Sequence, residues 1–390
     1  MINRSIEKSR FARRLTAVGT ACALVLCAHA ASALEPEEAK RIFDRVTGVP
    51  PTQAQIDQMV SIGDPIQAAL QVAAEDENFY NVTLKNFVTP WTNRDQTVFA
   101  PLNDYTATVI GMVRDNFAFN TALSADIIYT VNAGGLPAAS PANNNHYEQA
   151  ETNGVNLKAA LQAQQQSAVY GTPAAGVAGL FTTRAASAAF FVAGTNRAMF
   201  RFTMINHMCR DMEQLHDTSR PPDRIRQDVA RSPGGDSRIF LNNCIGCHSG
   251  MDPMAQAFAY YNFNETSGQL EYTPGAVQPK YFLNADNFKP GFVTPNDSWE
   301  NRWRHGQNSI YGFSASLPGS GTGAKSLGDE IANSDQFATC QVEKVWKAVC
   351  FRAPSLNGVD RDAVGQIAGH FKANGYKLKN VFAEVAARCD

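Results

Sequence analysis

Two cysteines and a histidine stand together at Cys244-Ile-Gly-Cys247-His248, and this spacing occurs once in the chain. Thiols separated by two residues can each form a thioether bond with one vinyl group of a haem. A histidine directly after the second cysteine then lies under the porphyrin as the proximal ligand of the iron. The sequence therefore predicts one covalent haem c, with Cys244 and Cys247 as attachment points and His248 as an iron ligand.

A bare Cys-x-x-Cys pair has two other common uses, as half of a zinc site and as a thioredoxin-like redox pair. A zinc site needs two more ligands, and the chain contains no second Cys-x-x-Cys and no His-x-His pair. A redox pair would follow a βαβ pattern and needs no histidine after it. The flanks of the motif are typical of a short helix followed by a turn, which Asp252 caps before Pro253. These residues favour haem attachment.

The first 33 residues have the pattern of a secretory signal peptide. Basic residues from Arg4 to Arg14 precede an apolar run from Leu15 to about Ala30, and Ala31-Ser-Ala33 is a small-x-small cleavage site. The apolar run is too short for a comfortable membrane span, and no later segment is long enough. We expect a periplasmic protein whose mature chain starts near Leu34 and has no membrane span.

Removal of the signal peptide also changes the charge balance. The full chain has 34 Lys and Arg against 36 Asp and Glu, and the leader holds five of the basic residues and one of the acidic ones. The mature chain therefore has 29 basic and 35 acidic residues, a net charge of about −6. No basic stripe remains that would suit nucleic acid, so we expect no nucleic-acid partner.

Four cysteines of the mature chain lie outside the haem motif: Cys209, Cys340, Cys350 and Cys389. Four such cysteines in an exported protein predict two disulfides, for which three pairings exist. Apolar spacing from Ser334 to Cys350 predicts a continuous helix, in which ten residues place Cys340 and Cys350 about 15 Å apart, beyond disulfide reach. We favour Cys350–Cys389 with Cys209–Cys340. The other cross-pairing and free buried thiols are the alternatives.

Helical spacing of apolar residues recurs along the mature chain and predicts a mainly α fold, with a multi-helix cytochrome c-like haem region and an additional helical domain. Thr52 stands where a helix cap is expected, and Gly63-Asp64-Pro65 starts a further helix. The aromatic, turn-rich stretch 260–295 allows short strands. The stretch 143–156 is polar and rich in asparagine, which is typical of a surface loop. We divide the chain into a signal peptide (1–33), an N-terminal helical region (34–142), a polar loop or linker (143–173) and a haem-binding helical domain (174–390).

The residues from Cys244 to Met254 also carry a family resemblance. Cys-Ile-Gly-Cys-His-Ser-Gly-Met-Asp-Pro-Met resembles the haem-motif-plus-Asp-Pro signature of the planctomycete-type cytochrome c proteins, whose domains are also found in proteobacteria. The likeness extends to residues 179–182, 197–209 and 334–340, and more faintly to 41–48. The resemblance implies an exported, multidomain mono-haem protein with helical packing, and it leaves the substrate open.

The second axial ligand of the iron decides between an electron carrier and an enzyme. The last methionine is Met254, six residues after His248, so the downstream methionine of small cytochromes c is absent. We single out His305 as a candidate iron ligand, because it lies 57 residues downstream of His248 in a stretch whose Trp and Arg side chains could contact a porphyrin and its propionates. A surface or hydrogen-bonded histidine is the alternative reading. The other candidate ligands are Met251, Met254, Met204, Met208, His207 and His216. An iron with no protein ligand at its sixth position is a further alternative. His370 is expected on the exposed side of a closing helix.

These residues favour an exported mono-haem c-type cytochrome that transfers single electrons between periplasmic redox partner proteins. Ligation by His305 would predict a low reduction potential. The alternative is an enzyme with an open iron, peroxidase-like or oxygenase-like, in which His305 would act with Arg302 or Arg304 on the distal side. A haem-bearing binding module is a third reading. The sequence identifies no catalytic residue outside this stretch.

Overall fold

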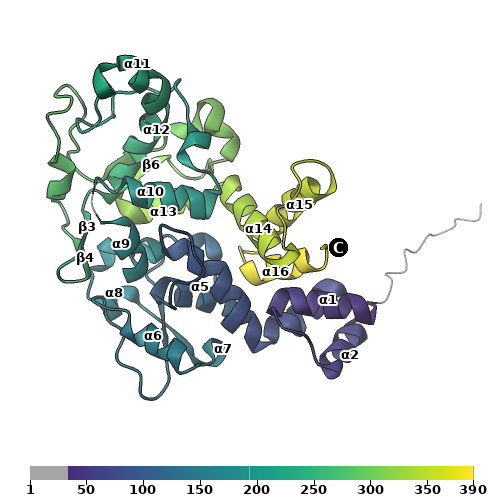
Figure 1. The fold of residues 1–390 in the computed structure, drawn as a ribbon. Coiled ribbons are helices and arrows are strands. Elements are labelled where there is room, and N and C mark those ends of the chain that lie inside the picture. The colour runs from purple at the N-terminus through teal and green to yellow at the C-terminus, as the bar shows by residue number, and fades with distance from the viewer. Residues whose placement is uncertain (1–33, 193, 390) are drawn as a thin grey trace, which may run out of the picture. The chain divides into compact units, whose positions relative to one another are not determined.

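The computed structural model describes residues 34–192 and 194–389, and helices account for most of its regular structure (Figure 1). The predicted mainly α fold is therefore confirmed, whereas the signal peptide falls outside the described residues. The described residues form one compact unit. No helix of the described part is both long enough and apolar enough to cross a membrane.

Three helices begin the described chain: α1 (Pro36–Thr47), α2 (Gln53–Ile62) and α3 (Pro65–Gln71). The predicted cap Thr52 is in place, and a helix starts at Pro65 as expected. The Thr52 side chain accepts a hydrogen bond from the Gln55 backbone N–H in a capping box, and Asp64 accepts one from the Gln67 N–H. Each cap satisfies a backbone donor that the first helical turn would leave unpaired, which stabilises the helix start by about 1 kcal/mol.

Helix α5 (Asp104–Arg114) is buried along nearly its whole length. Gly111 lies in the middle of α5, and the ring of Tyr129 occupies the space that a side chain would need there. The other helices of this part of the chain are α4 (Lys85–Val88), α6 (Asn145–Thr152), α7 (Leu157–Ala160), α8 (Gln166–Tyr170), α9 (Arg184–Phe190) and α10 (Arg197–Thr203), of which α4, α7 and α9 pack on α5.

Three antiparallel strand pairs accompany the helices in the described chain. β1 (Ile128–Val131) pairs with β2 (Leu161–Gln164), with Ile128 opposite Gln164. β3 (Tyr261–Asn264) pairs with β4 (Gln269–Tyr272), which confirms short strands within 260–295. β5 (Ser298–Glu300) pairs with β6 (Ser320–Thr322), and α13 (Gly323–Ala332) follows directly.

The C-terminal helices pack against the start of the described chain. α14 (Asp335–Cys350), α15 (Val359–Ala373) and α16 (Leu378–Ala386) form a group in which α16 contacts α1 and α3 (Figure 1). The continuous helix predicted from Ser334 to Cys350 is confirmed. It separates Cys340 from Cys350, and the favoured wiring is also confirmed: Cys209 pairs with Cys340, and Cys350 pairs with Cys389.

The prediction of a polar loop at 143–156 is wrong in its local structure. Residues Asn145–Thr152 form α6, whose buried side chains include His146 and Tyr147. The backbone N–H of Val131 donates to His146 Nε2, and the Tyr147 hydroxyl donates to the Tyr129 carbonyl. This helix has few apolar residues. Its buried side chains His146 and Tyr147 instead form hydrogen bonds with neighbouring backbone groups. The stretch therefore belongs to the packed unit and is no linker.

Candidate haem site

The cysteine motif lies on a helical segment that begins at α11 (Ser237–Ile239), continues through one π-helical turn (Phe240–Cys244) and runs on as α12 (Ile245–Ala255). Side chains three and four positions apart share one face of a helix. Cys244, Cys247 and His248 therefore project to the same side, which we call the front face. The predicted turn after the motif is wrong, because α12 continues through Asp252 and Pro253 to Ala255.

The opposite side of α12, its rear face, is made of glycine and packs closely on two rings. A Cβ at Gly246 would lie 2.5 Å from His216 Nε2, and one at Gly250 would overlap Trp303 Nε1. Both glycines are about 200° around the helix from His248. They let His216 and Trp303 approach the helix backbone on the side opposite His248.

Both motif thiols are free and half-buried, whereas the other four cysteines of the described chain form disulfides. Cys247 Sγ donates to the Met212 carbonyl oxygen at 3.3 Å. Burial raises the pKa of the Cys247 thiol, with a further contribution from the neighbouring Cys244. Two cysteines three apart on a helix have Cβ atoms about 5–6 Å apart, beyond the usual disulfide spacing, so the helix keeps this pair open.

Asp252 binds the ring of His248 one helical turn away. Nδ1 of His248 lies 3.1 Å from Asp252 Oδ1, and the Asp252 side chain is fully buried. Burial by itself raises the pKa of Asp252, but Arg197, Arg226 and His248 together bring that pKa well below its ordinary value. An ionised carboxylate can only accept, so His248 Nδ1 donates in this contact and Nε2 is the ring nitrogen that Asp252 leaves free. Asp252 thus orients the histidine and is not the turn cap that we predicted.

Two arginines and a second carboxylate hold Asp252 in place. Arg197 donates from Nε and Nη2 to both Asp252 oxygens at 2.9 and 3.0 Å, and from Nη1 and Nη2 to Asp228 at 2.7 and 2.9 Å. Arg226 is almost completely buried and lies 3.8 Å from Asp252 Oδ1. Burial by itself lowers the pKa of Arg197, but Asp252 and Asp228 raise it above its ordinary value. The result is a hydrogen-bonded chain from Asp228 through Arg197 and the buried Asp252 to His248.

His305 is not among the side chains that the structure brings to the motif. It is exposed and lines a cavity with Arg220, Arg224 and the Gly319–Thr322 segment, and Cys244, Cys247 and His248 do not line that cavity. The residues beside it pack around His216, since Gln307 Nε2 donates to the His216 carbonyl and Asn308 Nδ2 to that of Leu215. His305 as an iron ligand stays a prediction without a supporting contact.

The aromatic and basic neighbours of His305 have other partners than a porphyrin. Trp303 is fully buried behind α12. Arg302 pairs with Asp223 and Glu300, and Arg304 pairs with Glu330. The expectation that Trp303 lies against the porphyrin and that these arginines pair with its propionates is therefore not supported.

The other candidate ligands occupy the core or the rear face. His207 is buried, and its ring stacks on Phe337. A hydrogen bond of 3.0 Å joins its Nε2 to the Tyr105 hydroxyl. His216 contacts the rear of α12. Met204, Met208, Met251 and Met254 are core residues. His370 is exposed, as expected, and binds Glu384.

Sequence reasoning missed the roles of Arg197, Asp228 and Arg226. Arg197 lies 55 residues before Asp252, and no local pattern links the two. The available signal was Asp252, one helical turn after His248. Its neighbour Pro253 suggested a turn instead. In the described chain, no cluster of three or more His, Cys, Asp or Glu side chains is arranged to hold a metal ion by itself. No family model, curated protein or solved structure matches the chain.

Proposed function

We propose that this protein carries one covalent haem c on Cys244 and Cys247, with His248 as an axial iron ligand, and transfers single electrons in the periplasm. The observation that carries the proposal is the His248–Asp252 hydrogen bond, 3.1 Å long and anchored by Arg197. A histidine used only for packing does not need a buried, ionised carboxylate behind it. A metal-ligating histidine characteristically has such a partner on its other ring nitrogen.

The residues of the front face fit the group. Cys244 and Cys247 are free and half-buried, so a thioether can form at each sulfur without breaking a disulfide. His248 keeps part of its side chain, 19 %, exposed, with Nε2 available as a ligand. Leu241, three positions before Cys244, is 53 % exposed. This apolar side chain provides surface that a bound porphyrin would cover.

When bound, the haem supplies a reversible one-electron couple of its iron. The chain contributes the rest. Asp252 holds the His248 ring in one tautomer and increases the basicity of Nε2, and its negative charge favours the ferric over the ferrous form. The same residues therefore predict a low reduction potential for the carrier, whichever group provides the second axial ligand.

Export is part of this proposal. Disulfides persist in oxidising compartments and are rare in the cytosol. The Cys209–Cys340 and Cys350–Cys389 bridges are therefore compatible with a periplasmic location. Redox partner proteins in that compartment would deliver and accept the electron.

A second function, an enzyme with an open iron, is favoured by the same carboxylate. A strongly donating proximal ligand promotes cleavage of an iron-bound O–O bond in haem enzymes. Asp252 makes His248 such a donor. The distal residue that this chemistry requires has no counterpart among the described contacts of the front face, and we therefore rank the enzyme second.

Optical spectra of the purified holoprotein test the proposal. Expression with a c-type haem attachment system should give one haem per chain that stays with the polypeptide in acidified organic solvent, and Cys244→Ser with Cys247→Ser should abolish this. A reduced low-spin spectrum that carbon monoxide leaves unchanged is expected for the carrier. Immediate binding of carbon monoxide would favour the enzyme, and a chain without covalent haem under these conditions would refute both.

A further inference from the structure

Three asparagines of this chain stand directly before a glycine, at Asn153-Gly154, Asn357-Gly358 and Asn374-Gly375. A glycine has no side chain to hinder the approach of another group to its own backbone nitrogen. That nitrogen can therefore reach the side-chain carbonyl carbon of the preceding asparagine, which is the first requirement for loss of the side-chain amide as ammonia. All three pairs are exposed, so exposure does not distinguish between them.

Two of the pairs follow the C-terminal ends of helices, where the glycine nitrogen already donates a hydrogen bond. The Gly154 N–H donates at 2.9 Å after α6, and the Gly375 N–H donates at 3.3 Å after α15, each to the backbone carbonyl three residues earlier. In addition, Asn153 Oδ1 accepts from Gln149 Nε2 at 2.8 Å. These bonds must break before the nitrogen can lose its proton and turn toward the side chain, so they oppose the reaction.

Asn357 and Gly358 differ from the other two pairs in having both reacting groups free. The Gly358 N–H and the Asn357 side chain take part in none of the hydrogen bonds between described residues. The bond that Asn357 does make uses its backbone carbonyl, which accepts from the Ser355 hydroxyl at 2.9 Å. The Asp360 carboxylate accepts from the Ser355 N–H at 2.8 Å and binds Arg352. The pair therefore lies unrestrained in a loop whose two ends are joined by Arg352 and Asp360.

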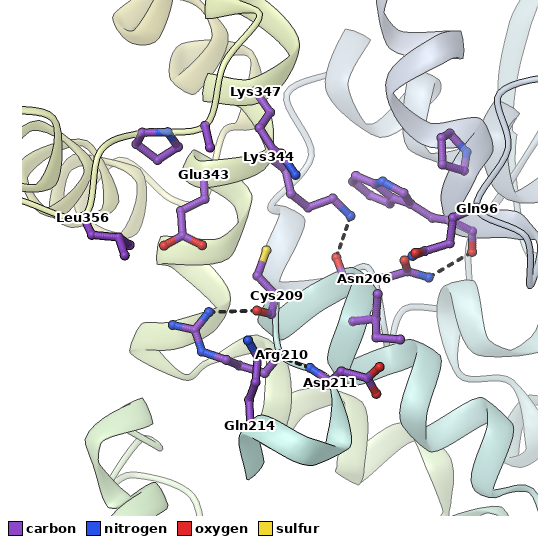
Figure 2. A pocket seen from close by; sticks show the side chains of 15 residues that line it. Gln96, Asn206, Cys209, Arg210, Asp211, Gln214, Glu343, Lys344, Lys347 and Leu356 are labelled. Atoms are coloured by element: carbon purple, nitrogen blue, oxygen red, sulfur yellow. Dashed lines mark hydrogen bonds between the residues drawn. The ribbon is translucent and has the colours of Figure 1, made fainter.

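The loop that carries this pair joins α14 to α15, and its apolar side chains are poorly packed. Phe351, Leu356 and Val359 are 74 %, 84 % and 85 % exposed. Leu356, directly before Asn357, lies at the edge of a cavity that is also lined by α14 and by the stretch 205–214 (Figure 2). Few packing contacts therefore restrain the rotation that brings the Gly358 nitrogen onto the Asn357 side chain.

We propose that Asn357 is a site of spontaneous deamidation, with water as the co-reactant. Hydroxide removes the proton from the Gly358 nitrogen, and this nitrogen then forms a bond to Cγ of Asn357. The bond from Cγ to the side-chain nitrogen breaks, and ammonia leaves with a proton from water, which restores hydroxide. A second water opens the resulting five-membered imide at either carbonyl, so the product at position 357 is aspartate or isoaspartate.

The product adds one negative charge just before α15. The positive end of the helix dipole lies there and favours an added carboxylate. The bond between Cys350 and Cys389 continues to hold the helices on either side of the loop together. The site shares no residue with the haem motif, so this proposal is independent of the proposed function.

Peptide mapping of the purified, folded protein tests the proposal. Samples kept in mildly alkaline buffer are digested with trypsin at successive times, and fragment mass spectra assign the conversion of amide to acid at Asn153, Asn357 and Asn374. We expect Asn357 to react about threefold to tenfold faster than either of the others, the factor that a hydrogen bond of ordinary strength represents. A rate at Asn357 equal to or below that of Asn153 or Asn374 would overturn the proposal.

The unfolded chain and two variants supply the controls. In guanidinium chloride with a thiol reductant no pair keeps its hydrogen bonds, so the three rates should become alike, and a difference that persists there would refute the structural argument. On ion exchange, the main acidic species of the aged parent should elute with freshly prepared Asn357→Asp. Asn374→Gln should form this species as the parent does, whereas Asn357→Gln should not. Its undiminished formation in Asn357→Gln would place the modification elsewhere and refute the site.

Discussion

Replacing Asp252 by asparagine tests the central contact of the haem site. Asparagine has nearly the same shape as aspartate, and its amide oxygen can still accept from His248 Nδ1 across the present 3.1 Å. The substitution therefore removes the negative charge and keeps the hydrogen-bond geometry. Arg197 loses one of its two carboxylate partners and keeps Asp228.

The expected size of the effect follows from these contacts. A hydrogen bond to a charged group is worth about 1.5–3 kcal/mol and a neutral one about 0.5–1.5 kcal/mol, a difference of about 1–1.5 kcal/mol. If the ferric form loses this stabilisation relative to the ferrous form, the one-electron midpoint potential rises by about 45–65 mV. Breaking a buried ion pair costs about 3–5 kcal/mol, and because Asp228 still binds Arg197 we expect a loss of unfolding free energy of about 3 kcal/mol.

Spectroelectrochemical titration of the holoprotein measures the potential, and urea unfolding measures the stability. Asp228→Asn is the matched control, since Asp228 binds the same arginine but does not contact His248. We expect the control to lose stability with a much smaller rise in potential. An unchanged or lower potential in a folded Asp252→Asn holoprotein would refute the role that we assign to Asp252, and so would equal shifts in the two variants.

Further predictions concern packing, covalent links and pH. Gly250→Ala places a methyl group on the indole of Trp303 and should lower the unfolding free energy by about 1–3 kcal/mol in a thermal or urea melt, whereas a melt like that of the parent would contradict the close contact. Cys350→Ser removes the bond to Cys389, which closes a loop of 39 residues. The variant should lose about 3–4 kcal/mol of unfolding free energy. A reductant should then cause no further loss of unfolding free energy through this bridge. Burial lowers the pKa of His207 well below its ordinary value, so the folded chain keeps the ring neutral while the unfolded chain binds a proton below about pH 6.5. The contribution of His207 to the unfolding free energy is therefore complete above that pH and falls by about 1.4 kcal/mol per pH unit below it. Urea unfolding of His207→Gln between pH 7 and 5 should show an unfolding free energy that depends on pH less steeply than in the parent, by that amount.

Local sequence patterns predicted several elements well. The cap Thr52, the helix that ends at Cys350 and the strands within 260–295 depend on short-range geometry, and all are present. The same short-range geometry excluded a Cys340–Cys350 bond, because one long helix separates these cysteines, and it left the other two pairings open. Helix α6 was not predicted, because its buried side chains His146 and Tyr147 are polar and form hydrogen bonds with neighbouring backbone. Such residues give no apolar periodicity in the sequence.

The cysteine motif by itself determined the proposed group and the two sulfurs and nitrogen that would hold it, because covalent attachment needs only residues three and four apart on one helix. It could not determine what lies behind that helix. Trp303 and His216 reach the rear face through Gly246 and Gly250, and Arg197 reaches Asp252 from 55 residues away. These contacts depend on burial and charge compensation between segments distant in the chain. Only the tertiary structure brings them together, because a buried carboxylate stays ionised only where cations from other segments surround it.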